Sequence, residues 1–262
     1  MLLTLSGARP SPNVLGGPKR RGAAVDDELT REDLFQAADR LVEEVLSAAG
    51  VTRPPVDAVD LARRHFGMTV REEAAPNPRA RVWGAGTGNA LQLSPEASEE
   101  SRQWTAARAV GARLKGDLLR RLGFDAGFRI GLSGESLPDL LARRLLTPGA
   151  WFAGDARGCD WDILELKRLY ATAGHEVVAW RLLDLPTACV ITVVENDHVH
   201  RRRSNAWRVS KTLQPAEREC QRYVHGFSRP RVVSADGWTV QGWPLHRPDW
   251  KREILRSVAD AE

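Results

Sequence analysis

Two short patterns in the chain place histidine and carboxylate side chains where they could bind a metal ion. His175-Glu176-Val177-Val178-Ala179 is one residue short of an HExxH motif, because an alanine stands at the position of the second histidine. In HExxH the two histidines lie one helical turn apart and reach a single Zn²⁺ ion. His198 and His200 alternate on an expected strand and therefore share one face. Neither pattern has an evident third ligand, so both are more typical of surface histidines.

The basic residues are densest in one segment, Arg201-Arg202-Arg203, with Arg208 and Lys211 close behind. Such a patch can contact phosphates, which keeps DNA binding as an alternative function. A run of charges is more often a solvated turn, however, and the net charge of +4 is mild for 262 residues.

The three cysteines, Cys159, Cys189 and Cys220, suit neither a disulfide framework nor a CxxC metal site, because they are odd in number and widely spaced. No apolar run approaches the roughly 20 residues that span a bilayer. The opening residues are too short and too poor in charge for a secretion signal. We therefore expect a cytoplasmic protein with reduced thiols and no membrane partner.

Three segments in order along the chain resemble the ImmA/IrrE family of zinc metallopeptidases. The first runs from Pro55 to Val70 and is similar to the family's entry helix, with Leu61-Ala62 and Gly67 in register. The second, 104–112, stands where the family has its HExxH helix. The third, 135–148, follows the register of the next family helix without a gap. The similarity covers about residues 55–185 and includes the Arg181-Leu182 pair.

The resemblance implies a scaffold without its catalytic residues. Carried over by register, the first histidine is Arg108, the catalytic glutamate is Ala109 and the second histidine is Ala112, while Glu135 keeps the third ligand. Arginine stays protonated and cannot bind zinc, and alanine offers neither a ligand nor a base. We therefore expect no cofactor, although the family uses zinc. A lone buried carboxylate is costly unless paired, which leads to the hypothesis that Arg108 pairs with Glu135.

Periodicity and capping residues predict an α+β fold: a mainly helical, zincin-like minimal metallopeptidase domain with a small sheet, then a small α+β module. The division is a disordered leader at 1–25, the degenerate metallopeptidase domain at 26–186 and the module at 187–262. Helices are expected at 30–50, 54–67, 94–123, 136–146, 161–170, 175–183, 215–225 and 249–259. Strands are expected at 68–71, 82–83, 90–93, 189–194, 199–203, 232–233 and 238–243, with a hairpin turn at 84–88.

The resemblance and the lost catalytic residues together predict a non-catalytic protein that regulates or binds a partner, in bacterial stress response or in the control of mobile elements. The family implies a protein partner, a helix-turn-helix transcriptional repressor, whose binding could outlast the loss of cleavage. The competing hypothesis is an active zinc peptidase with unusual ligands drawn from Glu135, His175, His198 and His200. Direct DNA binding through Arg201–Arg203 is the third.

Overall fold

The computed structural model describes residues 4–5, 29–73, 89–128, 130–131 and 135–260. Of the leader expected at 1–25, only the short strand β1 (Thr4–Leu5) is described, and it pairs with β4 (Ile130–Gly131). The expected strand at 82–83 and the turn at 84–88 lie outside the described residues. Among the described residues, no helix combines the length and the apolar character that crossing a bilayer requires.

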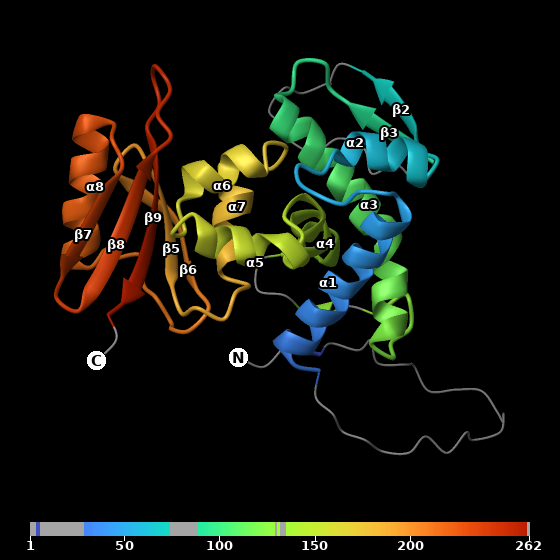
Figure 1. Ribbon diagram of the computed structural model, residues 1–262, viewed down its shortest axis with the longest axis horizontal. Helices are drawn as coiled ribbons and strands as arrows, with labels where there is room; N and C mark the ends of the chain where they lie inside the picture. The colour runs from blue at the N-terminus through green and yellow to red at the C-terminus, as the bar shows by residue number, and fades with distance from the viewer. Residues whose placement is uncertain (1–3, 6–28, 74–88, 129, 132–134, 261–262) are drawn as a thin grey trace, which may run out of the picture.

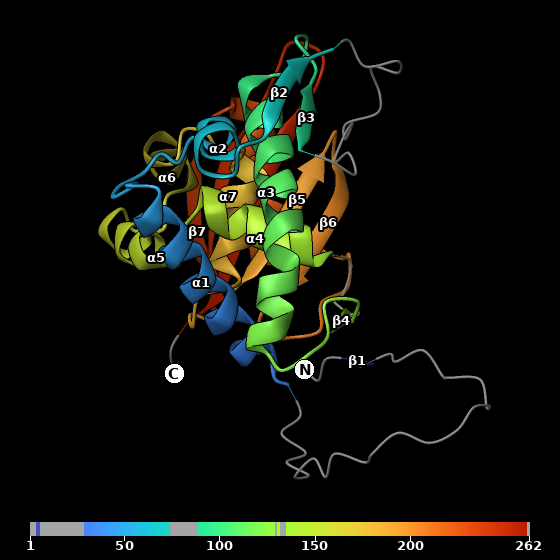
Figure 2. The same cartoon turned by 90° about the vertical axis from the view of Figure 1, so that its right-hand side faces the viewer.

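The first two thirds of the chain form a bundle of helices with two small two-stranded sheets (Figures 1 and 2). The helices are α1 (Arg31–Ala48), α2 (Ala58–Asp60) with a π-helical turn (Leu61–His65), α3 (Glu99–Arg121), α4 (Leu137–Leu146), α5 (Gly149–Gly158), α6 (Ile163–Leu169) and α7 (His175–Leu182). Between them, β2 (Thr69–Glu72) and β3 (Ala90–Leu93) pair in parallel. The long helix α3 packs along α4, as Figure 2 shows.

Local capping explains several helix boundaries. Thr30 and Ser136 each begin a helix through a capping box. The side chain of the capping residue accepts a hydrogen bond from the backbone N–H of the third helical residue, and the carboxylate of that third residue accepts one from the backbone N–H of the capping residue. The predicted start of α3 at Ser94 is wrong, because Ser98 caps the helix and the residues between form a turn. Asp57 caps α2, so that helix also begins later than 54. Helix α5 was not predicted.

The last third of the chain forms a five-stranded antiparallel sheet in the order β6-β5-β9-β8-β7. Its elements are β5 (Val190–Glu195), β6 (His198–Ser204), α8 (Pro215–Phe227), β7 (Arg231–Ala235), β8 (Trp238–Pro244) and β9 (Arg252–Ala259). The strands expected at 189–194 and 199–203 are confirmed and pair as the hairpin β5–β6. Those expected at 232–233 and 238–243 are also confirmed and pair as β7–β8. Figure 1 shows the sheet between α8 on one side and α5 to α7 on the other.

The helix predicted at 249–259 is wrong, because residues 252–259 form the central strand β9. The strand is buried on both faces: Ile254 belongs to the main core, and Leu255 packs in the small core under α8. A strand covered on both sides reads as a continuous buried run and shows no alternation that would distinguish it from a helix.

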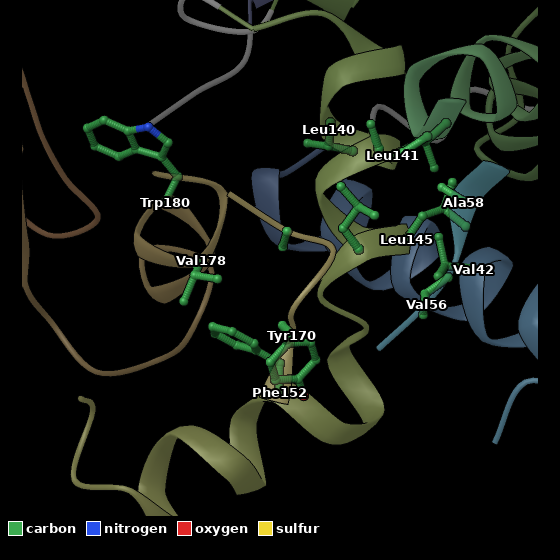
Figure 3. Packing of buried hydrophobic residues seen from close by; sticks show 14 of the residues in the cluster. Val42, Val56, Ala58, Leu140, Leu141, Leu145, Phe152, Tyr170, Val178 and Trp180 are labelled. Atoms are coloured by element: carbon green, nitrogen blue, oxygen red, sulfur yellow. The ribbon is translucent and has the colours of Figure 1, made fainter. Parts of the chain in front are cut away.

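One large core links the helices to the sheet. It contains apolar residues of α1, α3, α4 and α7, which Figure 3 shows in part, together with Ile191, Val193, Trp243 and Ile254 of the sheet. A second, smaller core lies between α8 and the opposite face. The architecture is therefore mixed α+β as predicted, whereas the division into units near 186 stays a prediction.

Candidate functional site: an arginine-lined cavity

A cavity of about 770 Å³ opens between the helical bundle and the sheet. Its walls come from one face of α3, the start of α4, α7, strand β6 and the segment between β8 and β9. Among the described residues, six arginines line it: Arg108, Arg143, Arg201, Arg203, Arg247 and Arg252. Four carboxylates and three tryptophans, Trp104, Trp180 and Trp250, complete the charged and aromatic lining. The arrangement suits recognition of a charged ligand with apolar parts.

Arg108 and Glu135 both line this cavity, but the predicted pair between them is not formed. Arg108 instead forms an ion pair with Asp139, and Glu135 accepts hydrogen bonds from Arg143 at 2.5 and 3.1 Å. Asp139 lies in the first turn of α4, where the helix dipole favours an anion. Arg143 follows two turns after Glu135 and binds it through both oxygens. Each of the four charged side chains therefore has an oppositely charged partner, although not the predicted one.

The side chains at the family's zinc position do not fit zinc. Arg108 is a cation, Ala109 is buried, and Ala112 is exposed on α3 and adds no ligand. Glu135 could supply an oxygen, but both of its oxygens are bound by Arg143. A zinc site of this kind needs at least three protein ligands. These residues therefore support no catalytic step through a metal at this position.

Beneath the cavity floor lies a buried charge network that the sequence reasoning missed. Arg144 and Arg181 surround Asp184, whose side chain is 1% exposed, and Arg181 also binds Asp39 at 2.6 Å. Burial lowers the pKa of Arg144 to about 10. Burial alone would raise the pKa of Asp184, but Arg144, Arg143 and Arg181 hold it well below its usual range. The network joins α1, α4 and α7 and so fixes the helices behind the cavity.

The basic segment 201–203 is neither a continuous patch nor a solvated turn. Alternate residues of β6 point to opposite faces of the sheet. Arg202 is almost buried and donates to both carboxylate oxygens of Glu217 on α8, at 2.9 and 2.8 Å. Arg201 and Arg203 line the cavity on the other face. A phosphate backbone could not contact all three at once.

Arg203 is a cavity cation that forms no ion pair with the described residues. Its guanidinium lies 5.5 Å from the centre of the Trp180 ring, and burial lowers its pKa. Within the described residues it forms no ion pair, whereas Arg201 lies 3.8 Å from Glu176. A half-buried cation without a carboxylate favours an incoming anion.

The histidine patterns come apart in the structure. His175 and Glu176 begin α7, are half-buried and line the cavity, and burial lowers the pKa of His175. His198 and His200 are exposed on β6 and do not gather with Glu135.

A different group does gather within the described residues. It consists of His225, His246 and Glu253, from three separate elements. No sequence spacing signalled it, because its members are far apart in the chain and Glu253 lies in the segment 249–259 that had been expected to form a helix.

Comparison with known proteins gives a fold and no family. No protein-family model matches the chain, and no curated protein matches it. The fold is similar to that of a solved structure named as a Mycobacterium tuberculosis transcriptional regulator, with a TM-score of 0.64 and 17% sequence identity. The alignment covers 87% of this chain and 80% of that chain. At this identity the likeness establishes the shared mixed α/β architecture.

Proposed function

We propose that the chain is a non-catalytic regulatory protein on an ImmA/IrrE-type metallopeptidase scaffold. Its cavity binds an acidic segment of a protein partner, and the partner is a helix-turn-helix transcriptional repressor. The observation that carries the proposal is Arg203, which lies half-buried over Trp180 and forms no ion pair with the described residues.

The distribution of charge in the cavity supports an anionic ligand. All four lining carboxylates already have a cationic partner: Asp139 with Arg108, Glu135 with Arg143, Glu176 with Arg252 and Glu100 with Lys167. Among the described residues, Arg203 and Arg247 have no such partner. The cavity therefore presents two arginines that form no ion pair with the described residues, and arginine binds carboxylates with two parallel hydrogen bonds.

The tryptophans support a peptide over a small inorganic anion. Trp104, Trp180 and Trp250 come from α3, α7 and the loop before β9, so they offer aromatic surface on three walls. Tryptophan and arginine are enriched among the few residues that contribute most of the binding energy at protein interfaces. The name of the structural neighbour, a transcriptional regulator, agrees with a regulatory role.

The scaffold assignment rests on the resemblance in 55–185. The non-catalytic assignment rests on the loss of two zinc ligands, at Arg108 and Ala112, and of the catalytic glutamate, at Ala109. Glu135, the surviving ligand of the family pattern, serves as the partner of Arg143. Arg108, on α3, then has a structural role, because it forms an ion pair with Asp139 in the first turn of α4. Binding without cleavage is what such a site can still provide.

The test combines gene deletion with matched charge variants. The gene for this chain is deleted, and the strain is complemented with the wild type, Arg203→Gln or Arg208→Gln. Transcript levels across the genome are then compared with those of the parent strain. Arg208 is the control because it is exposed on the chain after β6, outside the cavity, and loses the same charge. We expect the wild type and Arg208→Gln to restore transcription and Arg203→Gln to fail. Equal complementation by both variants would count against the cavity.

A second arm addresses the partner. Helix-turn-helix repressors encoded in the same genome are co-expressed with the tagged chain. The chain is purified, and mass spectrometry shows whether a repressor co-purifies with it and whether that repressor is intact. We expect a repressor to co-purify intact with the wild type and to be lost with Arg203→Gln. Cleavage of the repressor that disappears in Glu135→Ala would instead establish the peptidase alternative.

A further inference from the structure

Three side chains from separate elements meet at one end of the sheet. His225 lies in the last turn of α8, His246 follows β8, and Glu253 is the second residue of β9. His225 Nδ1 and His246 Nε2 each lie 2.9 Å from Oε1 of Glu253. The three atoms all lie within 4.8 Å of one another. The fold thus brings two imidazole nitrogens and a carboxylate oxygen to one point.

These separations are close to those of a metal-bound set. Zinc binds histidine nitrogen and carboxylate oxygen at about 2.0–2.2 Å, so tetrahedral ligands lie roughly 3.4 Å apart. Each nitrogen of the two histidines would move about half an ångström from Glu253 to admit the ion.

Hydrogen bonding alone leaves Glu253 incompletely satisfied. The residue is fully buried, and its second oxygen, Oε2, accepts no hydrogen bond from the described residues. No lysine or arginine among those residues pairs with it, and its ionic contacts are to His225 and His246 alone. A buried carboxylate without a permanent cation is costly. A divalent ion would neutralise it and could use the orphaned oxygen as well.

The surroundings orient the histidines as ligands. Ser228 Oγ lies 2.9 Å from Nδ1 of His246. When this Nδ1 carries the proton and donates to Ser228, Nε2 is left free to bind a metal, which is the usual arrangement around ligating histidines. Ser228 ends α8 in a left-handed conformation, with φ of 53°. Asp197 lies beside His225, with Oδ1 at 3.2 Å from Nδ1, and Gln221 donates to that same Oδ1.

We propose that His225, His246 and Glu253 bind one divalent transition-metal ion, with zinc as the ion that two imidazoles and a carboxylate suit best. The ion would tie the end of α8 to β9 and to the loop 245–251. Leu245, His246, Arg247 and Trp250 of that loop form one wall of the cavity. Metal binding would therefore fix this wall. The site is separate from the family's zinc position and does not depend on the function proposed above.

The test uses the full chain, purified without chelators, then stripped and titrated with Zn²⁺ alone by calorimetry. We expect one ion per chain and a rise in melting temperature on binding. His225→Ala and His246→Ala should each weaken binding on the order of 100-fold, because each removes one of three ligands. His198→Ala is the matched control, since His198 is exposed on β6 and outside the group. Its affinity should equal that of the wild type.

Two further measurements keep the result decisive if an alanine variant is poorly folded. Glu253→Gln preserves the shape of the side chain while removing its charge, and it should also lose the ion. Co²⁺ substitution in the wild type should give the intense visible absorption of a four-coordinate site, abolished in His246→Gln. A wild type that binds neither ion, or that keeps its affinity in the His225 and His246 variants, would overturn the proposal. Ion loss in Glu135→Ala but not in these variants would place the metal at the family position instead.

Discussion

Replacing Gly111 with alanine should destabilise the protein, although the same change in most helices stabilises it. Gly111 lies in the middle of α3 where the helix crosses α4, and an added Cβ would lie 2.6 Å from the backbone oxygen of Pro138. It would also meet Leu141 Cβ at 3.2 Å. Alanine gains about 0.5–1 kcal/mol in helix propensity. Overpacking against a backbone atom that cannot rotate away costs about 1–3 kcal/mol. We expect a net loss of about 1 kcal/mol, and at most about 2.5 kcal/mol.

Gly116 on the same helix supplies the control. A Cβ there would meet only Ala126 Cβ, at an ordinary 3.8 Å, so Gly116→Ala should gain about 0.5–1 kcal/mol. Urea unfolding followed by circular dichroism measures both variants. For a chain of this size each kcal/mol shifts the melting temperature by about 2–4 °C. If Gly111→Ala proved as stable as Gly116→Ala, the close contact between α3 and α4 would be refuted.

Three further changes probe the frame of the cavity. Asp184→Asn removes the anion from the cations of Arg144 and its neighbours, and should cost about 3–5 kcal/mol in urea unfolding. Folding lowers the pKa of Asp184, so its contribution to the free energy of unfolding is full above about pH 4 and is lost as the pH falls toward the pKa of the folded state. The stability of the wild type should therefore fall more steeply with acid than that of this variant. Ser136→Ala breaks the capping box of α4 and should cost about 1 kcal/mol, with no change if Asp139 alone holds the turn. Glu135→Ala should leave the zinc content of the purified chain unchanged; a loss of zinc would revive the peptidase hypothesis.

Much of the helical part could be predicted because its signals are local. Thr30 and Ser136 carry their own capping boxes, and Pro138 could stand only in the first turn of α4. The hairpin at Asn196 and Asp197 was equally readable, since both residues adopt positive φ, which these side chains tolerate. In each case a few neighbouring residues determine the geometry.

The central strand β9 could not be predicted, because its identity depends on distant partners. It lies between β5 and β8, and both faces are covered, so its sequence carries no alternation. The metal-binding group of His225, His246 and Glu253 was missed for the same reason. Its members meet only when β9 is a strand.

The candidate site was predicted in its place but not in its contacts. The register brought Arg108 and Glu135 to one cavity, yet side-chain pairing is decided by atoms within a few ångströms. Arg108 pairs with Asp139 at the start of α4, and Glu135 pairs with Arg143 on the same helix. The role of Arg203 could not be read from a run of three arginines, because only the sheet shows that its neighbour Arg202 faces α8.

The most direct test of the account is the affinity of the cavity for an acidic peptide. A fluorescein-labelled hexaglutamate peptide is titrated with the full chain, and the anisotropy is compared for the wild type, Arg203→Gln and Arg208→Gln. A hydrogen bond to a charged group contributes about 1.5–3 kcal/mol, so Arg203→Gln should weaken binding about 10- to 100-fold. Arg208→Gln should change it little, and the tryptophan emission of the wild type should respond as the cavity fills. Equal affinities for the two variants would contradict the claim that this cavity is the binding site.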